Sequence, residues 1–291
     1  MIITIKNEAI SLSADTLGAQ LMSIKGENGC EYLWQGDPAY WSNRAPNLFP
    51  FIARLTEGSY TYNGERFSMP NHGFAAKQEF IAQKTSDSRV VFSLAANEQT
   101  RNMYPREFIY EVIYELIGNT VAITYAVENT GSERMHFAVG GHPGFCVPLE
   151  SGKDFSDYSL VFSEKCEPDR VGFTPTVYLS GCDERYPLDG GDTMHLTHEM
   201  FDDDAVILKN MAREVTLRCD GGERGLTVSY PDMPYLGIWH RPQTDAPYVC
   251  IEPWSSLPSR QDVVEEFTCK SDLLALDGGK RYENRWTVTV F

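Results

Sequence analysis

Two consecutive segments with period-two alternation constrain the fold of this chain more than any other feature. Residues 107–116 alternate large apolar side chains with residues that include three glutamates, and residues 120–128 place β-branched and aromatic residues at the odd positions. In a β-strand, alternate side chains point to opposite faces, so each segment predicts a strand with one buried face. Gly118-Asn119 lies between them and predicts the turn of a β-hairpin.

The same pattern, in shorter segments, runs through most of the chain. A second hairpin is predicted around Asn63-Gly64, a dipeptide suited to a type I′ turn. Further strands are predicted at residues 2–5, 9–13, 21–25, 89–95, 134–139, 158–162, 205–209, 214–219, 226–230, 236–239 and 284–291. Helical periodicity is almost absent, and only residues 197–201 and 261–267 suit a short helical turn.

Many short strands joined by hairpins, without alternating helices, predict an all-β fold: a large antiparallel β-sandwich or barrel. No segment rich in proline, glycine or serine marks a domain boundary, and no repeat of fixed period is present. Sandwiches and barrels approach this length as one unit. We therefore expect one domain over residues 1–291.

The charge of the chain restricts its partners. The formal net charge is −16, which repels nucleic acid and anionic lipid surfaces. The first residues follow a strand pattern and lack the features of a signal peptide, and no apolar run is long enough to span a bilayer. The seven cysteines are scattered, without the close pairs of a zinc ribbon. These features predict a cytoplasmic protein with reduced thiols that binds neither nucleic acid nor membrane; they do not predict an oligomeric state.

One carboxylate stands in an apolar, aromatic stretch, Cys250-Ile251-Glu252-Pro253-Trp254. Residues 248–251 predict a buried strand that ends at Glu252, because Pro253 cannot donate to a strand ladder. Desolvation beside Trp254 would raise the pKa of Glu252 and make it suitable as a general base. The alternative is a glutamate that caps a turn or pairs with an arginine, and the segment alone does not decide between them.

A histidine follows the strand predicted at residues 134–139. Three glycines and a proline surround His142 in Gly140-Gly141-His142-Pro143-Gly144-Phe145, which predicts a bent loop that exposes the imidazole. Histidine titrates near neutrality, so His142 would serve as the acid if Glu252 is the base. An isolated histidine is more often a hydrogen-bonding group at a strand end, but the glycine-rich setting favours function.

Other polar groups near apolar segments are ambiguous. His72 lies in Asn71-His72-Gly73, which is also ordinary turn chemistry. Arg44 and Arg54 flank an apolar stretch, where they either hold a polar ligand or pair with carboxylates. Asp202-Asp203-Asp204 fits a solvated turn better than a metal site, because three consecutive side chains cannot converge on one ion. The segment with His195 and His198 fits no metalloprotease motif.

Taken together, these motifs resemble those of the aldose 1-epimerase (galactose mutarotase) superfamily. The resemblance rests on the order of Arg54, the segment 57–64, His72-Gly73, His142 and Glu252. Segments 42–50, 141–145 and 250–254 are most similar to the bacterial LacX-type branch. The resemblance implies a large antiparallel β-sandwich that binds a small-molecule sugar in a cleft on one sheet face, with no cofactor and no metal.

By this resemblance, Glu252 matches the catalytic base, His142 the catalytic acid and His72 a second active-site histidine. Arg54 matches the arginine that holds the sugar hydroxyls, and Asp204 is the better match for a sugar-binding aspartate, with Asp203 one residue away. Gly141 and Pro143 replace the usual asparagine and aromatic neighbours of the histidine, so the resemblance does not extend to a preference for galactose.

The implied reaction is the interconversion of α and β anomers of a hexose. The base removes the proton of the anomeric hydroxyl, the acid protonates the ring oxygen, and the roles reverse on closure. We expect an apolar wall for the sugar, and the candidates for it are Trp239, Trp254 and Phe145.

Three alternatives remain. A hexose-6-phosphate mutarotase would need a phosphate clamp, for which Arg44 is the first candidate and Lys77 and Arg106 are weaker ones. A glycosidase would need a second carboxylate across the bond from Glu252. A noncatalytic sugar-binding or sugar-sensing protein would not require a matched acid and base.

Overall fold

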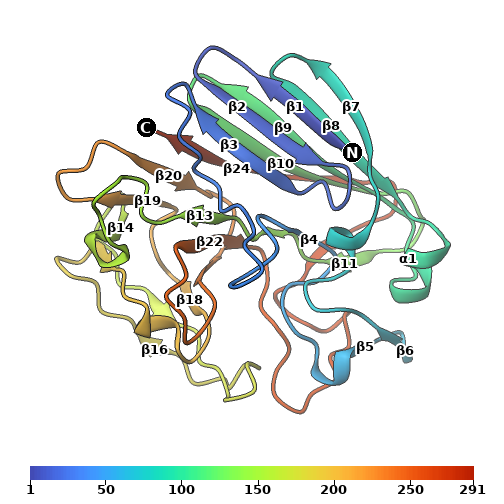
Figure 1. Ribbon diagram of the computed structural model, residues 1–291. Coiled ribbons are helices and arrows are strands. Elements are labelled where there is room, and N and C mark those ends of the chain that lie inside the picture. Colours follow the sequence, from blue (N-terminus) through green and yellow to red (C-terminus); the bar gives the residue numbers. More distant parts are fainter.

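Nine strands form the largest sheet of the computed structural model, which describes residues 1–291 (Figure 1). All strand pairs in it are antiparallel, and the strand order is β17-β14-β19-β20-β24-β10-β9-β8-β7. The bounds are β7 Ile81–Ser86, β8 Arg89–Ala95, β9 Phe108–Ile117, β10 Thr120–Asn129, β14 Tyr158–Phe162, β17 Thr193–His195, β19 Glu214–Cys219, β20 Gly225–Ser229 and β24 Arg281–Val290.

The central hairpin of this sheet confirms the prediction from alternation. Strands β9 and β10 pair from Thr120↔Ile117 to Asn129↔Phe108, with the turn at Gly118-Asn119. Along β9, buried and half-buried residues alternate up to Leu116. The glutamates therefore lie on the outer face and the aromatic side chains on the core face, as the sequence pattern requires.

A second, eight-stranded sheet carries the residues of interest. Its order is β16-β15-β18-β21-β22-β12-β4, and β13 also pairs with β22. The bounds are β4 Asn47–Leu48, β12 Gly140–Gly141, β13 Gly144–Cys146, β15 Asp169–Arg170, β16 Glu184–Arg185, β18 Val206–Lys209, β21 Tyr235–Trp239 and β22 Tyr248–Trp254. All seven residues of β22 are buried, so this strand lies inside the molecule.

Three smaller sheets complete the architecture. The first is a three-stranded sheet of β1 Ile2–Lys6, β2 Ile10–Asp15 and β3 Leu21–Gly26. The other two are pairs of strands: β11 Met135–Phe137 pairs with β23 Leu274–Leu276, and β5 Ser59–Tyr62 pairs with β6 Glu65–Ser68. The β5–β6 turn confirms the second predicted hairpin, because Asn63 and Gly64 have φ values of 52° and 83°, the positive values that a type I′ turn needs.

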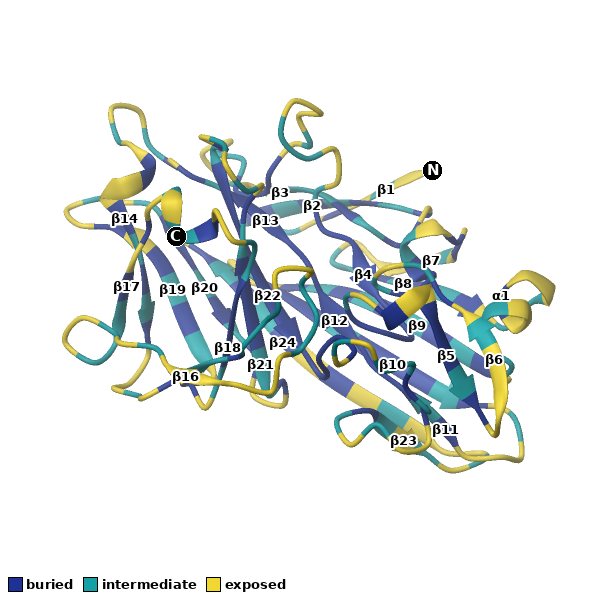
Figure 2. Ribbon diagram, turned by 90° about the horizontal axis from the view of Figure 1, so that it is seen from below, coloured by how far each residue is buried: buried dark blue, intermediate teal, exposed yellow.

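One continuous core joins the layers. A single cluster of 72 buried residues includes side chains from the three-, nine- and eight-stranded sheets. In Figure 2 the strands are mainly dark where they face one another, and the exposed residues gather in the connecting loops. The protein is a single-domain antiparallel β fold, as predicted.

Helical structure is sparse, but one helix was not predicted. Helix α1, Glu98–Met103, begins with a capping box in which Asn97 accepts from the backbone of Thr100, and a cap of this kind stabilises a helix too short to show periodicity. Short 3₁₀ segments occur at η1 Thr56–Gly58, η2 Ala75–Lys77, η3 Phe155–Asp157 and η4 Glu199–Phe201. The turn predicted at 197–201 is confirmed, whereas residues 261–267 are not helical. None of the helices has the length and apolar character required to cross a membrane.

Strand β7 was also missed from the sequence. Its residues are almost all exposed at the edge of the sheet, so they lack the apolar alternation on which the prediction of strands depends.

Candidate active site

Strand register brings His142 and Glu252 together. On one side of β22, Gly140 of β12 pairs with Trp254, and Gly144 of β13 pairs with Cys250. Counting inward from these two pairs places His142 opposite Glu252. Residues directly opposite each other in antiparallel strands have neighbouring side chains, and the His142 Nε2 and Glu252 Oε2 atoms are 3.3 Å apart.

The surroundings of both residues differ from the prediction. The glycine-rich segment is not a bare loop, because it forms strands β12 and β13, and His142 is only 9% exposed. Strand β22 does not end at Glu252 but continues through Pro253, which lies opposite Leu236 of β21. Pro253 has no N–H to donate, so the ladder lacks a hydrogen bond at this position, but the strand continues through it.

Glycine is needed at Gly141 for close packing. A Cβ atom on Gly141 would approach Trp286 Cζ2 to 2.7 Å and Tyr125 Oη to 3.0 Å, distances that a side chain cannot keep. The glycines therefore allow β12 to pack against the nine-stranded sheet, which holds His142 inside the molecule and not in an exposed loop.

Burial strongly perturbs both members of the pair. Desolvation, and secondarily the Asp204 carboxylate, raise the pKa of Glu252 well above its usual value. Desolvation, and secondarily His72, lower the pKa of His142 well below its usual value. Burial thus favours the neutral carboxylic acid of Glu252 and the neutral imidazole of His142 over their charged forms.

Both groups also have polar atoms without a protein partner. His142 Nδ1, Glu252 Oε2 and Trp254 Nε1 are buried and make no hydrogen bond within the protein; the 3.3 Å contact between the pair lacks hydrogen-bond geometry. Burying an unpaired polar atom costs about 1–3 kcal/mol. A group of such atoms in one place is a mark of a ligand site.

His72 is held as a hydrogen-bond donor. Its Nδ1 accepts from the backbone N–H of Ala53 at 3.1 Å, so the neutral ring carries its proton on Nε2. Burial, and secondarily Arg54, lower the pKa of His72 to about 4. The His72 and His142 rings meet edge to face, with centroids 5.3 Å apart.

A pocket of about 420 Å³ contains this group. It brings together six of the predicted site residues: Arg54, His72, His142, Asp204, Trp239 and Glu252. Asp204, two residues before the start of β18, lines the pocket, whereas Asp203 does not. A concave site with apolar walls and a few convergent polar groups is typical of small-molecule binding.

The structure does not place Arg44 at this site. Its guanidinium donates to Met22 O at 2.6 Å and to Gln35 Oε1 at 2.7 Å, and it does not line the pocket. The weaker phosphate-clamp candidates also lie elsewhere: Lys77 is exposed, and Arg106 stacks on the Tyr62 ring.

The aromatic wall differs in part from the prediction. Trp239 and Trp254 line the pocket, but Phe145 is fully buried in the core. Sequence reasoning missed Trp41, whose ring stacks on His142 with centroids 4.9 Å apart. The only available signal was an aromatic residue in a polar loop. The pocket residues Asn43, Asn71, Phe173, Val177, Pro242 and Pro258 were likewise not predicted.

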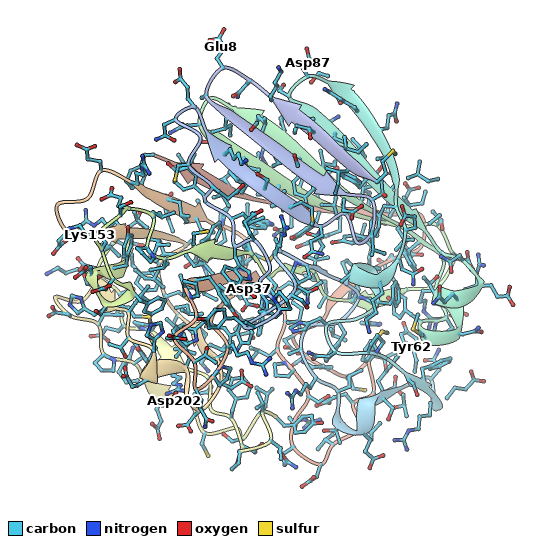
Figure 3. All side chains as sticks on the ribbon, viewed as in Figure 1. Glu8, Asp37, Tyr62, Asp87, Lys153 and Asp202 are labelled. Carbon is cyan, nitrogen blue, oxygen red and sulfur yellow. The ribbon has the colours of Figure 1, made fainter.

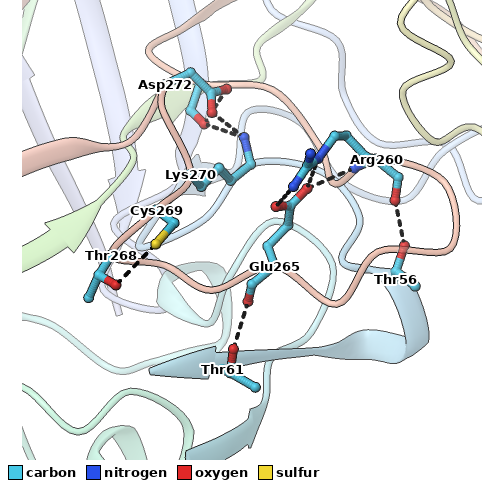
Figure 4. A network of polar contacts seen from close by, with 9 residues as sticks. Thr56, Thr61, Arg260, Glu265, Thr268, Cys269, Lys270 and Asp272 are labelled. Atoms are coloured by element: carbon cyan, nitrogen blue, oxygen red, sulfur yellow. Dashed lines mark hydrogen bonds and ion pairs between the residues drawn. The ribbon is translucent and has the colours of Figure 1, made fainter. Parts of the chain in front are cut away.

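A polar network fixes the loop that follows β22 (Figure 4). Arg260 makes a bidentate contact with the buried Glu265 at 2.9 and 3.0 Å, and Asp272 accepts from the backbone of Leu257 at 2.7 Å. Thr56 donates to Arg260 O at 2.8 Å. Because this loop contributes Pro258 to the pocket, the network supports one side of the pocket.

One group of donors has the composition of a metal site. Ligand atoms of His142, Cys250 and Glu252 lie within 4.8 Å of one another, and zinc accepts this set. However, burial raises the pKa of Cys250 well above its usual value, which disfavours the thiolate that a metal requires. Cys250 also does not line the pocket.

Comparison with known proteins places this site in context. The family model for aldose 1-epimerase matches residues 1–266. The chain is 34% identical over 292 aligned residues to the plasmid-encoded protein LacX of Lactococcus lactis subsp. lactis, covering 97% of each chain. The family model covers all of the pocket residues named above.

Solved structures agree with this relationship. A galactose mutarotase related enzyme from Lactobacillus acidophilus has 31% identity and a TM-score of 0.95, over 100% of this chain and 97% of that one. A galactose mutarotase-like protein from Lactobacillus casei has 30% identity and a TM-score of 0.93, with both chains fully covered. A putative aldose 1-epimerase from Escherichia coli K12, at 16% identity and a TM-score of 0.79, shares the fold. By its sequence and its fold, the chain belongs to the aldose 1-epimerase family.

Proposed function

We propose that the protein is an aldose 1-epimerase that interconverts the α and β anomers of an aldose, with His142 and Glu252 as the proton-transfer pair. The observation that carries the proposal is the cross-strand pair itself: an acid and a base 3.3 Å apart, both nearly buried and lining a 420 Å³ pocket. Ring opening needs one group to remove a proton and another to deliver one.

The reaction would proceed in two proton-coupled steps. Glu252 as carboxylate accepts the proton of the anomeric hydroxyl while His142 as imidazolium protonates the ring oxygen, and the C1–O5 bond breaks to give the open aldehyde. Rotation about C1–C2 presents the other face of the carbonyl. The ring oxygen then attacks C1, the proton returns to His142, and the carbonyl oxygen takes the proton held by Glu252.

One shared proton is enough for this cycle. Burial favours this proton on Glu252, because it raises the pKa of Glu252 and lowers that of His142. Transfer of this proton across the pair produces the carboxylate and imidazolium without uptake of a proton from solvent. The substrate hydroxyls and Arg54, which lines the same pocket, favour the charged form through hydrogen bonds and charge.

The remaining pocket residues suit the binding of a sugar. His72 donates from Nε2, Arg54 donates to hydroxyl oxygens, and Asp204 accepts from hydroxyl groups. Trp41 and Trp239 meet edge to face with centroids 5.6 Å apart and present apolar surface to the C–H groups of a pyranose.

A phosphorylated hexose is a weaker candidate. Arg54 is the only lysine or arginine that lines the pocket, which also contains the carboxyl groups of Asp204 and Glu252. A noncatalytic sugar-binding role leaves the perturbed acid–base pair unexplained, since hydroxyl recognition does not require it.

Polarimetry of freshly dissolved α-glucose and α-galactose and NMR exchange of their 6-phosphates would test the proposal. We expect acceleration of mutarotation for at least one neutral hexose. Binding without acceleration for every sugar would instead identify a sugar-binding protein, and acceleration restricted to the 6-phosphates would identify a hexose-phosphate mutarotase.

A further inference from the structure

Trp254 lies beside Glu252 on the same face of β22. The two residues are two positions apart in the strand, so their side chains point the same way, and both line the pocket. The indole N–H of Trp254 is covered by protein atoms, as is Glu252 Oε2, and neither atom makes a hydrogen bond within the protein. A buried donor without an acceptor therefore adjoins a buried acceptor without a donor.

Two glycines leave room for the indole and set its direction. Gly140 of β12 pairs with Trp254 on one side of β22, and Gly237 of β21 pairs with Glu252 on the other. A Cβ on Gly140 would lie 3.0 Å from Trp254 Cδ1, and a Cβ on Gly237 would lie 3.4 Å from Trp254 Cζ2 and 3.2 Å from Glu252 Cβ. Cδ1 and Cζ2 flank Nε1 along one edge of the indole. The N–H edge therefore runs from Gly140 toward the side chain of Glu252.

The ring is also held from the side of the pocket loops. The His72 ring meets the indole at an interplanar angle of 63°, with centroids 6.2 Å apart. His72 is itself fixed, because its Nδ1 accepts from the backbone N–H of Ala53 at 3.1 Å. A side chain locked by packing on several sides keeps its donor in one place, which is what support of a catalytic group requires.

The titratable and charged groups around Glu252 leave its buried oxygen without a donor. They are Asp204 before β18, Tyr248 and Cys250 on β22 itself, His142 between β12 and β13, and Arg54 and His72 from the pocket loops. None of them makes a hydrogen bond to Glu252 Oε2. Burial, and secondarily Asp204, raise the pKa of Glu252, whereas the Trp254 N–H lowers it.

We propose that Trp254 is a positioning residue whose indole N–H closes a hydrogen bond to the Glu252 carboxylate when Glu252 gives its proton to His142. The inference rests on the proposed function and adds a residue that acts on the reaction through Glu252. An indole N–H only donates and a carboxylate only accepts, and hydrogen bonds to a charged group are the stronger ones. Trp254 thus stabilises the charged form that burial disfavours. Because its N–H is covered, it does not act on the sugar directly.

Trp254→Phe removes the N–H group and keeps an aromatic ring. Without the donor the pKa of Glu252 should rise further. The alkaline limb of the kcat/KM profile, where Glu252 loses the proton of the pair, should then move up by about one pH unit. The carboxylate is also harder to reach in the reaction, so kcat should fall roughly tenfold with little change in KM. A fall in kcat with the alkaline limb in place would mean that Trp254 only shapes the pocket, and would overturn the inference.

A shape-preserving replacement separates the donor from the ring. In 3-benzothienylalanine, sulfur takes the place of the indole N–H group and the two fused rings are kept. With this residue in place of Trp254, we expect the same move of the alkaline limb as in Trp254→Phe, because the two variants share the loss of the donor. An alkaline limb like that of the wild type would contradict the proposal.

Two control variants test whether the alkaline limb responds to packing or to remote charge. Trp286 also has a buried Nε1 without a partner, but it does not line the pocket, so Trp286→Phe should lower stability and leave the limb in place. Asp87 lies in the turn between β7 and β8, at the outer end of the molecule (Figure 3), with a side chain that is 94% exposed. Asp87→Asn should change neither property. A move of the limb in either control, equal to that in Trp254→Phe, would refute the assignment.

NMR of the indole N–H groups provides a readout that does not depend on catalysis. In ¹⁵N-labelled protein, the Trp254 resonance is the one that is absent in Trp254→Phe. We expect it to move downfield as the pH rises between about pH 5 and about pH 10, when Glu252 becomes a carboxylate, and to stay in place in Glu252→Gln. A resonance that stays in place in the wild type, or moves equally in Glu252→Gln, would overturn the inference. If no sugar is turned over, the proposed function fails, and this resonance still decides whether Trp254 donates to Glu252.

Discussion

The nine-stranded and eight-stranded sheets of this protein differ in the length of their strands and in the pattern of their burial. In the first, β9 and β10 are ten residues long and alternate between the core and the outer face. In the second, β4, β12, β15 and β16 have only two residues each, and β22 is buried along its whole length with a glutamate inside it. The first sheet follows regular alternation, whereas the second, interrupted sheet holds the candidate acid–base pair.

This difference indicates where the fold tolerates buried polar groups that destabilise it. Glu252 and His142 contribute buried polar atoms without protein partners, which destabilises the folded state. The apolar face of the nine-stranded sheet, with Ile123 and Trp286 in the common core, offsets this cost. We therefore expect substitutions in the two sheets to affect separate properties, and the predictions below test this separation.

The largest effect is expected for Glu252→Gln. The amide keeps the shape of the side chain but cannot exchange the proton, so mutarotation should slow by roughly 100- to 10,000-fold. Because the amide keeps the shape of the side chain and carries no charge that burial would desolvate, the melting temperature should stay equal or rise. Turnover near that of the wild type, measured by polarimetry, would show that Glu252 is not in the proton-transfer pair.

His142→Asn should lower kcat by about 100-fold with little change in KM. The imidazole acts when the ring opens, and its loss is felt in the transition state. Arg54→Ala serves as the contrast, since Arg54 contacts hydroxyls that are present throughout, and it should mainly raise KM. An unchanged kcat in His142→Asn, with equal KM effects in both variants, would refute the assignment of His142.

The pH dependence of kcat/KM should have a plateau that extends through the usual histidine pKa. Activity requires one proton on the pair. The pair gains a second proton only when the pH falls below the lowered pKa of His142, and it loses its proton when the pH rises above the raised pKa of Glu252. Activity should therefore fall at the acidic and the alkaline ends. An inflection near pH 6.5 would contradict this account of the pair.

Ile123→Ala should affect stability and not catalysis. Ile123 is fully buried in β10, and its truncation should lower the free energy of unfolding by about 2–5 kcal/mol. The matched control is Ile117→Ala, because Ile117 is 53% exposed and should change stability little. Urea denaturation and kcat, measured on the same samples, report stability and catalysis separately. A large loss of kcat in Ile123→Ala at a temperature where the variant stays folded would show that the two sheets do not affect separate properties.

The smallest effect is expected for chelation. Although His142, Cys250 and Glu252 could together hold a metal, the neutral Cys250 thiol disfavours it, and we expect activity to be unchanged after dialysis against EDTA. Loss of activity that one metal restores would mean that the pair acts through that metal.

The sequence by itself determined the strands that alternate regularly and the tight turns that join them. The hairpin of β9 and β10, the Asn63-Gly64 turn and the antiparallel β class follow from local alternation and turn chemistry. The sequence also singled out Glu252 and His142 as candidates, because a carboxylate in an apolar run and a histidine among glycines are conspicuous without any structure. The motif order further indicated the family, to which the family model assigns the chain.

Only the tertiary structure decided how these residues meet. The pairing of segment 140–144 with segment 250–254 is set by packing across the core, and no local pattern encodes a register between positions more than 100 residues apart. The same packing buried His142 and Phe145, which the sequence placed in an exposed loop and in the sugar-binding wall. It also turned Arg44 toward Met22 and brought Trp41 onto His142. Side-chain direction depends on such neighbours, and neighbours are a property of the folded chain.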